Sequence, residues 1–196
     1  MSPIKFMLAA LAISFSAATV VAPVATAQGT KMIVIDQAKI MRDSRAGKDI
    51  QTKMQSIESS IERELKPTAD ALNTEGRAIE AKTKNMTPDA MRADAALKAQ
   101  VTNYARKAQE FNIKRQIAAQ ELQLTERKAW GDFFTKLRPI LQEVVTERGA
   151  QVMFDRASVT YADPSIDATA LVISKMDSRV PTISVIRQRM PTQPAQ

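Results

Sequence analysis

The sequence predicts an α+β fold in which a long antiparallel coiled-coil helical hairpin projects from a small β body. Three observations predict it. A short β-branched run near the start is typical of a strand, two long stretches repeat apolar residues at steps of three and four, and short β-rich runs follow the second stretch. We assign residues 28–49 and 137–178 to the body, residues 50–136 to the hairpin arm, and residues 179–196 to a flexible, Pro-containing tail.

The first residues have the composition of a secretory signal peptide. Lys5 is followed by an uncharged apolar run over residues 6–21, and residues 25–27 (Ala-Thr-Ala) form a small-x-small cleavage site. We therefore expect residues 1–27 to be removed and the mature chain to be secreted. An uncleaved membrane anchor is the alternative, but the apolar run is short for spanning a bilayer.

The composition excludes several classes of function. The chain contains no Cys and no His, so it offers no thiolate nucleophile, no imidazole base and no conventional zinc or haem ligands. Five glycines leave no phosphate-binding loop or dinucleotide fingerprint. We therefore expect neither an enzyme nor a bound cofactor. The formal net charge of +7 favours acidic partners, and without disulfides the fold must be held together by packing or by oligomerisation.

The first strand and the first long helix follow each other closely. Residues 32–35 (Met-Ile-Val-Ile) are apolar and largely β-branched, which is typical of a strand buried on both faces. After Gly47 the apolar period changes to that of a helix. The stripe consists of Ile50, Met54, Ile57, Ile61, Leu65, Ala69, Leu72, Gly76 and Ile79. Pro67 lies inside this stretch, so we expect a kinked or flexible point there.

A turn and a second long helix come next. Thr87 is a good N-cap and Pro88 suits the first helical position, so we expect one helix of about 58 residues over residues 88–145. Its stripe consists of Leu97, Val101, Tyr104, Ala108, Phe111, Arg115, Ala118, Leu122, Thr125, Ala129, Phe133, Leu137, Ile140 and Val144. If the chain folds back near residue 86, the two stripes meet in antiparallel layers. The expected layers are Leu72 with Val101, Leu65 with Ala108, Ile61 with Phe111, Ile57 with Arg115, Met54 with Ala118, and Ile50 with Leu122.

The second helix returns the chain to the body. Over residues 130–145 the apolar residues spread around much of the helix, so this portion must be enclosed on several sides. Gly149 is expected to end the helix. Residues 150–155 and 158–162 then have the composition of two strands that could pair as a β-hairpin.

The last part of the chain contains a turn, a short helix and the tail. Residues 163–165 (Asp-Pro-Ser) predict a turn, and Asp167 is a suitable cap for a helix that carries Leu171, Val172 and Met176. Residues 183–186 could add an edge strand; otherwise they belong to the extended or disordered tail.

Two motifs that flank the hairpin resemble those of a known family. Residues 31–36 run into Ala-Lys-Ile-Met-Arg-Asp-Ser-Arg-Ala-Gly-Lys at residues 38–48, and Val-Thr-Tyr-Ala-Asp-Pro-Ser-Ile-Asp-Ala-Thr occupies residues 159–169. With the leader and the long hairpin, the chain resembles the Skp (OmpH) family of periplasmic chaperones as far as about residue 176. Pro67 and the tail beyond Arg179 are not part of the family pattern.

The resemblance implies a homotrimer in the periplasm. In such proteins the strands of three chains make one small β body, and three helical hairpins enclose a cavity that holds unfolded outer-membrane β-barrel proteins without ATP. The sequence is compatible with this assembly, because a few short strands per chain do not form a stable sheet alone. The residues that we expect to form the trimer are Met32, Ile33, Val34, Ile35, Val152, Phe154, Val159 and Tyr161.

An apolar stripe on the second helix is the first candidate client-binding surface. Ile113, Ile117 and Leu124 lie roughly 200° from the stripe that faces the first helix, so the hairpin cannot cover them. Scattered surface apolarity and trimer contacts are the alternative explanations. We favour a wall of the cavity that touches clients. Met86 and Met91 near the tip are further candidates, because Met adapts to varied partners, although a pair that packs the turn is equally compatible.

Basic residues in the distal half of the arm are the second candidate surface. Residues 77–115 contain nine Lys and Arg against four acidic residues, whereas residues 50–76 and 116–136 together contain six against eight. This excess favours acidic stretches of clients, anionic lipid or lipopolysaccharide. The candidate residues are Arg77, Lys82, Lys84, Arg92, Lys98, Arg106, Lys107 and Lys114. A solvated helix face, a coiled-coil envelope scaffold and a polyanion-binding protein remain alternatives, but nucleic acid is not expected because few aromatic residues are available for stacking.

Overall fold

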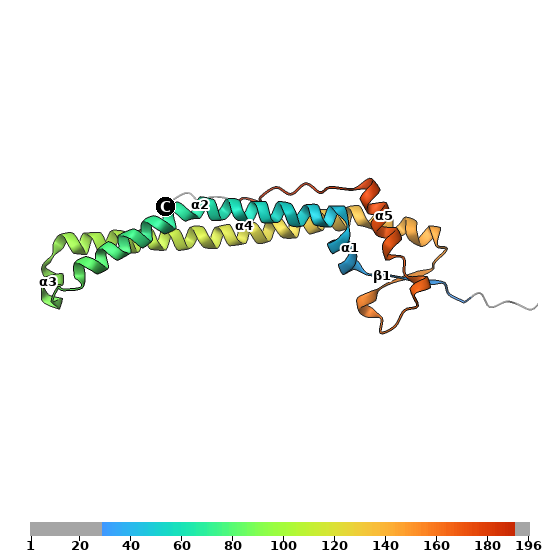
Figure 1. Ribbon diagram of the computed structural model, residues 1–196, viewed down its shortest axis with the longest axis horizontal. Coiled ribbons are helices and arrows are strands. Elements are labelled where there is room, and N and C mark those ends of the chain that lie inside the picture. Colours follow the sequence, from blue (N-terminus) through green and yellow to red (C-terminus); the bar gives the residue numbers. More distant parts are fainter. Residues whose placement is uncertain (1–28, 191–196) are drawn as a thin grey trace, which may run out of the picture.

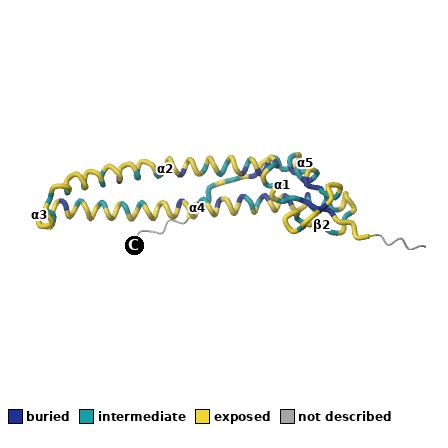
Figure 2. Tube along the Cα trace, turned by 60° about the horizontal axis from the view of Figure 1, so that its bottom comes forward, coloured by how far each residue is buried: buried dark blue, intermediate teal, exposed yellow. Residues whose placement is uncertain are grey.

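The computed structural model describes residues 29–190 and shows a long helical hairpin that extends from a small body (Figure 1). The predicted signal peptide, residues 1–27, lies outside the described residues. Figure 2 shows that buried residues concentrate in the body, whereas most of the arm is exposed. The predicted α+β class, with a long hairpin on a small β-containing body, is confirmed.

The body contains a two-stranded parallel sheet. β1 (Met32–Ile35) pairs in register with β2 (Val152–Asp155), and Met32 lies opposite Val152. The side chains of Ile33, Val34 and Ile35 are all less than 5% exposed, as expected for a strand covered on both faces. In the sequence, β1 therefore precedes the hairpin and β2 follows it.

The β-hairpin predicted over residues 150–162 is wrong in its second strand. After β2 the chain enters the 3-10 helices η1 (Arg156–Ser158) and η2 (Pro164–Ile166), and residues 158–162 form no strand. The physical reason is local. The Asp155 carboxylate accepts a hydrogen bond from the backbone N–H of Ala157 at 3.2 Å and starts a turn immediately after the strand.

A short helix that was not predicted from the sequence precedes the arm. α1 (Gln37–Asp43) starts at the Asp36 cap, and α2 (Arg45–Thr83) follows after Ser44 alone. Ser44 is fully buried, and its hydroxyl accepts a hydrogen bond from Gly47 N at 3.1 Å. α2 continues as a single helix through Pro67.

The core forms where α5 (Thr169–Arg179) packs against the root of α4 (Ala95–Glu147), α1, α2 and β1. Its buried residues include Ile40, Ile50, Phe133, Leu137, Ile140, Val144, Val172 and Met176. The prediction that residues 130–145 enter the body is therefore confirmed. Gly149, the residue expected to end the helix, has a φ of +58°, which favours glycine.

The tip differs from the prediction of one helix from residue 88 to residue 145. The predicted Thr87 cap and Pro88 start are confirmed, but they begin the six-residue helix α3 (Pro88–Ala93). Asp94 then adopts an extended conformation, and its carboxylate accepts from Leu97 N at 2.8 Å as the cap of α4. A second N-cap shortly after the first was present in the sequence and was missed.

The predicted register of the hairpin is wrong for the same reason. Gly76 approaches Tyr104, and Glu75 pairs with Lys107 at 2.9 Å. Leu72 lines a hollow together with Phe111, and Leu65 lines another together with Ala118, whereas the predicted partners were Val101 and Ala108. The partners on α4 lie about eight to ten residues later than predicted, between two and three helical turns, because α3 moves the centre of the turn beyond residue 86.

The edge strand that residues 183–186 could have added does not form. Residues 181–190 form neither a strand nor a helix, yet they lie along the hairpin and hold fixed contacts with it (Figures 1 and 2). Ile183 is only 4% exposed and joins the core. The burial of this one side chain, together with charged contacts further along, stabilises the contact of the segment with the hairpin.

Candidate functional site

The apolar stripe of α4 is exposed. Ile113 is 48% exposed, and Ile117 and Leu124 are each 37% exposed, which is unusual for side chains of this size on one helix face. In contrast, Ala118, Thr125 and Ala129 on the seam side of α4 are buried. The hairpin leaves the stripe available for contact with another molecule, as the helical period predicts. The client role of these residues remains a prediction.

The tip methionines are placed differently from the stripe. Met86 lies in the turn after α2, Met91 lies in α3, and both are half-buried. They are separated from Ile113 by several turns of α4, so the structure does not bring the two apolar groups together into one patch.

All eight candidate basic residues are exposed on the distal arm. Four of them form ion pairs: Lys82 with Asp94, Arg92 with Asp89, Arg106 with Glu110, and Lys107 with Glu75. Among residues 29–190, no acidic group lies within ion-pair distance of the other four, Arg77, Lys84, Lys98 and Lys114. Among the eight candidates, the positive charge that has no ion-pair partner in the described part of the chain therefore lies on these four side chains.

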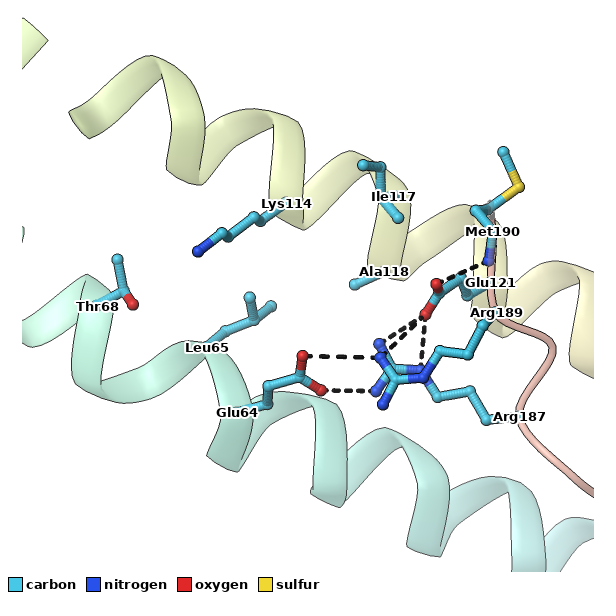
Figure 3. Close-up of a pocket in the computed structure, with 10 residues that line it drawn as sticks. All are labelled: Glu64, Leu65, Thr68, Lys114, Ile117, Ala118, Glu121, Arg187, Arg189 and Met190. Atoms are coloured by element: carbon cyan, nitrogen blue, oxygen red, sulfur yellow. Dashed lines mark hydrogen bonds and ion pairs between the residues drawn. The ribbon is translucent and has the colours of Figure 1, made fainter. Parts of the chain in front are cut away.

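A hollow of about 250 Å³ lies between α2 and α4 near the middle of the arm (Figure 3). Leu65, Ile117 and Ala118 contribute apolar surface, and Met190 of the tail closes one end. Lys114 also lines the hollow, so one apolar and one basic residue among the predicted candidates meet here. This arrangement suits an apolar side chain next to an acidic or polar group of a partner.

Two acidic residues beside this hollow receive an arginine from the tail. Arg187 donates from Nε to Glu121 at 2.8 Å and from Nη1 to Glu64 at 2.7 Å (Figure 3). Glu121 is only 3% exposed. The hydrogen bond from Arg187 lowers the pKa of the Glu64 carboxyl. Neither Glu121 nor Arg187 was predicted from the sequence, because a single Glu on a charged helix carries no signal that distinguishes it from a solvated residue.

The residues expected to form the trimer fall into two groups. Ile33, Val34 and Ile35 are buried within one chain, where they contribute to its own core. Met32, Phe154 and Tyr161 are 47%, 41% and 76% exposed, respectively. The other two, Val152 and Val159, are half-buried. Any contact between chains at this end would therefore use the exposed group on and beside the small sheet.

Residues 29–190 contain no group of three acidic side chains that could hold a metal ion. In the same part of the chain, no helix combines the length and the apolar character that crossing a membrane requires. The arrangement offers surfaces and a shallow hollow for contact with other molecules.

Comparison with known proteins connects this architecture with a family. Residues 31–176 match the model of the family described as outer membrane protein (OmpH-like). The chaperone protein Skp of Yersinia enterocolitica is 22% identical over 153 residues, which cover 78% of this chain and 89% of that protein. A crystal structure described as an outer membrane chaperone (OmpH-like) of Caulobacter crescentus CB15 superposes with a TM-score of 0.72 at 26% identity, covering 84% of this chain and 94% of the other. The chain therefore belongs to the OmpH-like outer membrane protein family.

Proposed function

We propose that this protein is an ATP-independent periplasmic holdase chaperone. It binds unfolded outer-membrane β-barrel proteins between helical arms and prevents their aggregation on the way to the outer membrane. Membership of the OmpH-like family supports the chaperone role. The observation that carries the proposal is the exposed stripe of Ile113, Ile117 and Leu124 on a slender arm, because packing within the hairpin leaves more than a third of each side chain exposed.

The proposed active assembly is a homotrimer. A two-stranded sheet and a thin hairpin bury little surface for a chain of this length, so association through Met32, Phe154 and Tyr161 would stabilise them. Three arms around a common body would present three stripes to one client. Several weak contacts then act together and hold a chain that has no fixed shape.

The proposed distal contact is with negative charge. Arg77, Lys84, Lys98 and Lys114 favour acidic stretches of the client, anionic lipid or lipopolysaccharide. A polyanion-binding protein is the alternative function. The two are separated by salt, because polyanion binding weakens steeply as ionic strength rises whereas apolar capture persists.

The first experiment measures holdase activity directly. An outer-membrane β-barrel protein unfolded in urea is diluted with and without the mature protein, and light scattering is followed. We expect suppression once the trimer exceeds the client in concentration. Undiminished scattering at that ratio would contradict the proposal.

A stripe variant tests whether the apolar residues bind the client. Replacing Ile113, Ile117 and Leu124 together with Ser is expected to weaken client affinity by about tenfold or more, because each apolar contact is lost. The matched control replaces the exposed neighbours Asn112, Gln116 and Gln123 with Ser on the same helix and is expected to behave as wild type. Circular dichroism and solution mass confirm that both variants keep their helices and assembly. If the two variants suppress aggregation equally well, the stripe has no client role.

A further inference from the structure

The tail residues 181–190 form a strap that crosses from the body to the middle of the arm. The strap starts after α5, passes Asp49 and Lys53 of α2, and ends beside Thr125 and Glu121 of α4. It lies outside residues 31–176, the part of the chain that matches the family model, whereas these four residues lie inside. They form a seat for an extended segment, and residues 181–190 of the same chain occupy part of it.

The seat contacts the main chain of the strap. Ile183 N donates to Asp49 Oδ2 at 2.9 Å, and the Ile183 carbonyl accepts from Lys53 Nζ at 2.7 Å. Gln188 N donates to Thr125 Oγ1 at 2.8 Å. Because every non-proline residue carries the same main-chain groups, these contacts can hold extended chains of different sequences.

Alternate side chains of the strap face the seat. Ile183 is buried, and Val185 and Arg187 are half-buried, whereas Ser184 is exposed and Ile186 is 70% exposed. This period of two is that of an extended chain. The seat therefore accommodates side chains at every second position, first two apolar residues and then a cation. The strands of β-barrel membrane proteins also alternate in apolar character.

The cation is required by Glu121. Among residues 29–190, the ion pairs of Glu121 come only from the strap, from Arg187 at 2.7 Å and from Arg189 at 3.7 Å. Met190 N adds a hydrogen bond at 2.9 Å. If the strap left, the Glu121 carboxylate would exchange these partners for water, so an occupant that brings a basic side chain restores the charge-assisted contacts.

The strap does not fill its seat. Besides the hollow near Met190, a second hollow of about 240 Å³ lies between α4 and the strap, lined by Ala129, Asp132 and Ile186. Larger side chains than those of the strap would find apolar and polar surface there. An extended chain with bulkier residues can therefore compete for the same contacts.

We propose that this seat is a binding site for an extended polypeptide with apolar residues at alternate positions followed by Arg or Lys, and that residues 181–190 occupy it in cis until a client chain displaces them. The identity of the competitor rests on the proposed function. The site itself is independent of it.

Binding of a peptide tests the site. A fluorescent peptide with the sequence of residues 181–190 is titrated into the full mature chain as wild type, as Arg187→Gln and as Arg148→Gln, and anisotropy is measured. We expect Arg187→Gln to bind the peptide at least about tenfold more tightly than wild type, because its own strap no longer satisfies Glu121. Arg148→Gln is the control for the loss of one positive charge and should resemble wild type, since Arg148 is exposed at the end of α4, outside the seat. A peptide carrying Arg187→Gln should lose most of its affinity.

Hydrogen exchange of the wild-type chain tests displacement without any variant. Adding an unfolded outer-membrane protein should remove the protection of the Ile183, Gln188 and Met190 amides, which the seat holds in the free chain. Equal peptide affinity of wild type and Arg187→Gln would overturn the site. Unchanged protection of these amides, in a sample whose wild-type chain suppresses aggregation, would overturn displacement while leaving the holdase function intact.

Discussion

At the scale of single residues, Gly47 marks the tightest packing in the body. A Cβ atom placed on Gly47 would lie 1.7 Å from the Met41 carbonyl oxygen, which is backbone and cannot move aside cheaply. Gly47 therefore permits the close crossing of α1 and α2 after the single residue Ser44. In the sequence, Gly47 only precedes the start of the helical period. The close approach of the Met41 backbone could not be predicted, because nothing in the local pattern reveals which segment will lie against Gly47.

Replacing Gly47 with Ala is expected to destabilise the chain by about 3 kcal/mol, since the backbone must separate to admit a methyl group. Gly131→Ala is the matched control, because Gly131 also lies inside a helix and a Cβ atom placed on it would meet no atom within 4 Å. That change should stabilise α4 by about 1 kcal/mol. Urea unfolding of both variants measures the free energies, and similar values for the two would contradict the packing argument.

Glu143 provides the clearest dependence on pH. It accepts hydrogen bonds from Arg179 and Lys175 of α5, and these bonds lower its pKa from 4.5 to about 2, with Arg179 the larger cause. A carboxyl whose pKa is lowered on folding stabilises the native state above its unfolded pKa. This stabilisation should therefore be complete above about pH 4.5 and should disappear as the pH falls toward 2.

Glu143→Gln should unfold at a lower urea concentration than wild type at pH 7, and the difference should shrink as the pH is lowered from 4.5 to 2. The midpoint is followed by circular dichroism. Glu126→Gln, an exposed change elsewhere on α4, controls for the loss of one negative charge. A difference that stays constant across this pH range would show that the ion pairs with α5 do not cause it.

At the scale of elements, the tip is where local sequence signals were present but were combined incorrectly. The Thr87 cap and Pro88 were predicted correctly, whereas Asp94 was assigned to the interior of a continuous helix. Asp94 caps α4 and also pairs with Lys82 at 3.1 Å across the hairpin. Helical periodicity alone could not reveal the break, because the apolar stripe of the second helix begins only at Leu97, after the break, and the register depends on the length of the turn.

Asp94→Ala is expected to cost about 1 kcal/mol, because it removes the side-chain cap of α4. The loss should appear locally as faster hydrogen exchange in the first turns of α4 around Leu97, with little change in the body. Asp89→Ala is the control, since Asp89 is exposed in the first turn of α3 and caps no helix. If exchange around Leu97 is unchanged in Asp94→Ala, the cap does not hold the tip.

At the scale of the whole molecule, the sequence predicted the individual elements better than the contacts between segments that are distant in the sequence. Strand β1, the enclosed root of α4 and the exposed stripe all follow from periods that one segment displays by itself. The parallel pairing with β2, the seating of the tail and the burial of Glu121 depend on which distant segments meet. The local sequence around Ile183 and Arg187 does not distinguish them from other residues of a Pro-containing tail, because their contacts with the arm form only in the folded chain.

The exposed side chains of the body lead to a prediction about assembly. Phe154→Ser and Met32→Ser together should weaken self-association by about tenfold or more, because both side chains are more than 40% exposed on the small sheet. Analytical ultracentrifugation over a range of concentrations measures the change. Ile186→Ser is the control, an exposed apolar residue on the strap away from the sheet. Equal association of the double variant and the control would place the contact between chains elsewhere.

The parallel pairing of β1 with β2 has a consequence for how the chain is made. Met32 and Val152 are partners although about 120 residues separate them, so the first strand to be synthesised has no partner until nearly the whole chain exists. The intervening helices need only local contacts and can form early. Because these helices run antiparallel, they bring β2 close to β1, which reduces the entropic cost of pairing the two strands.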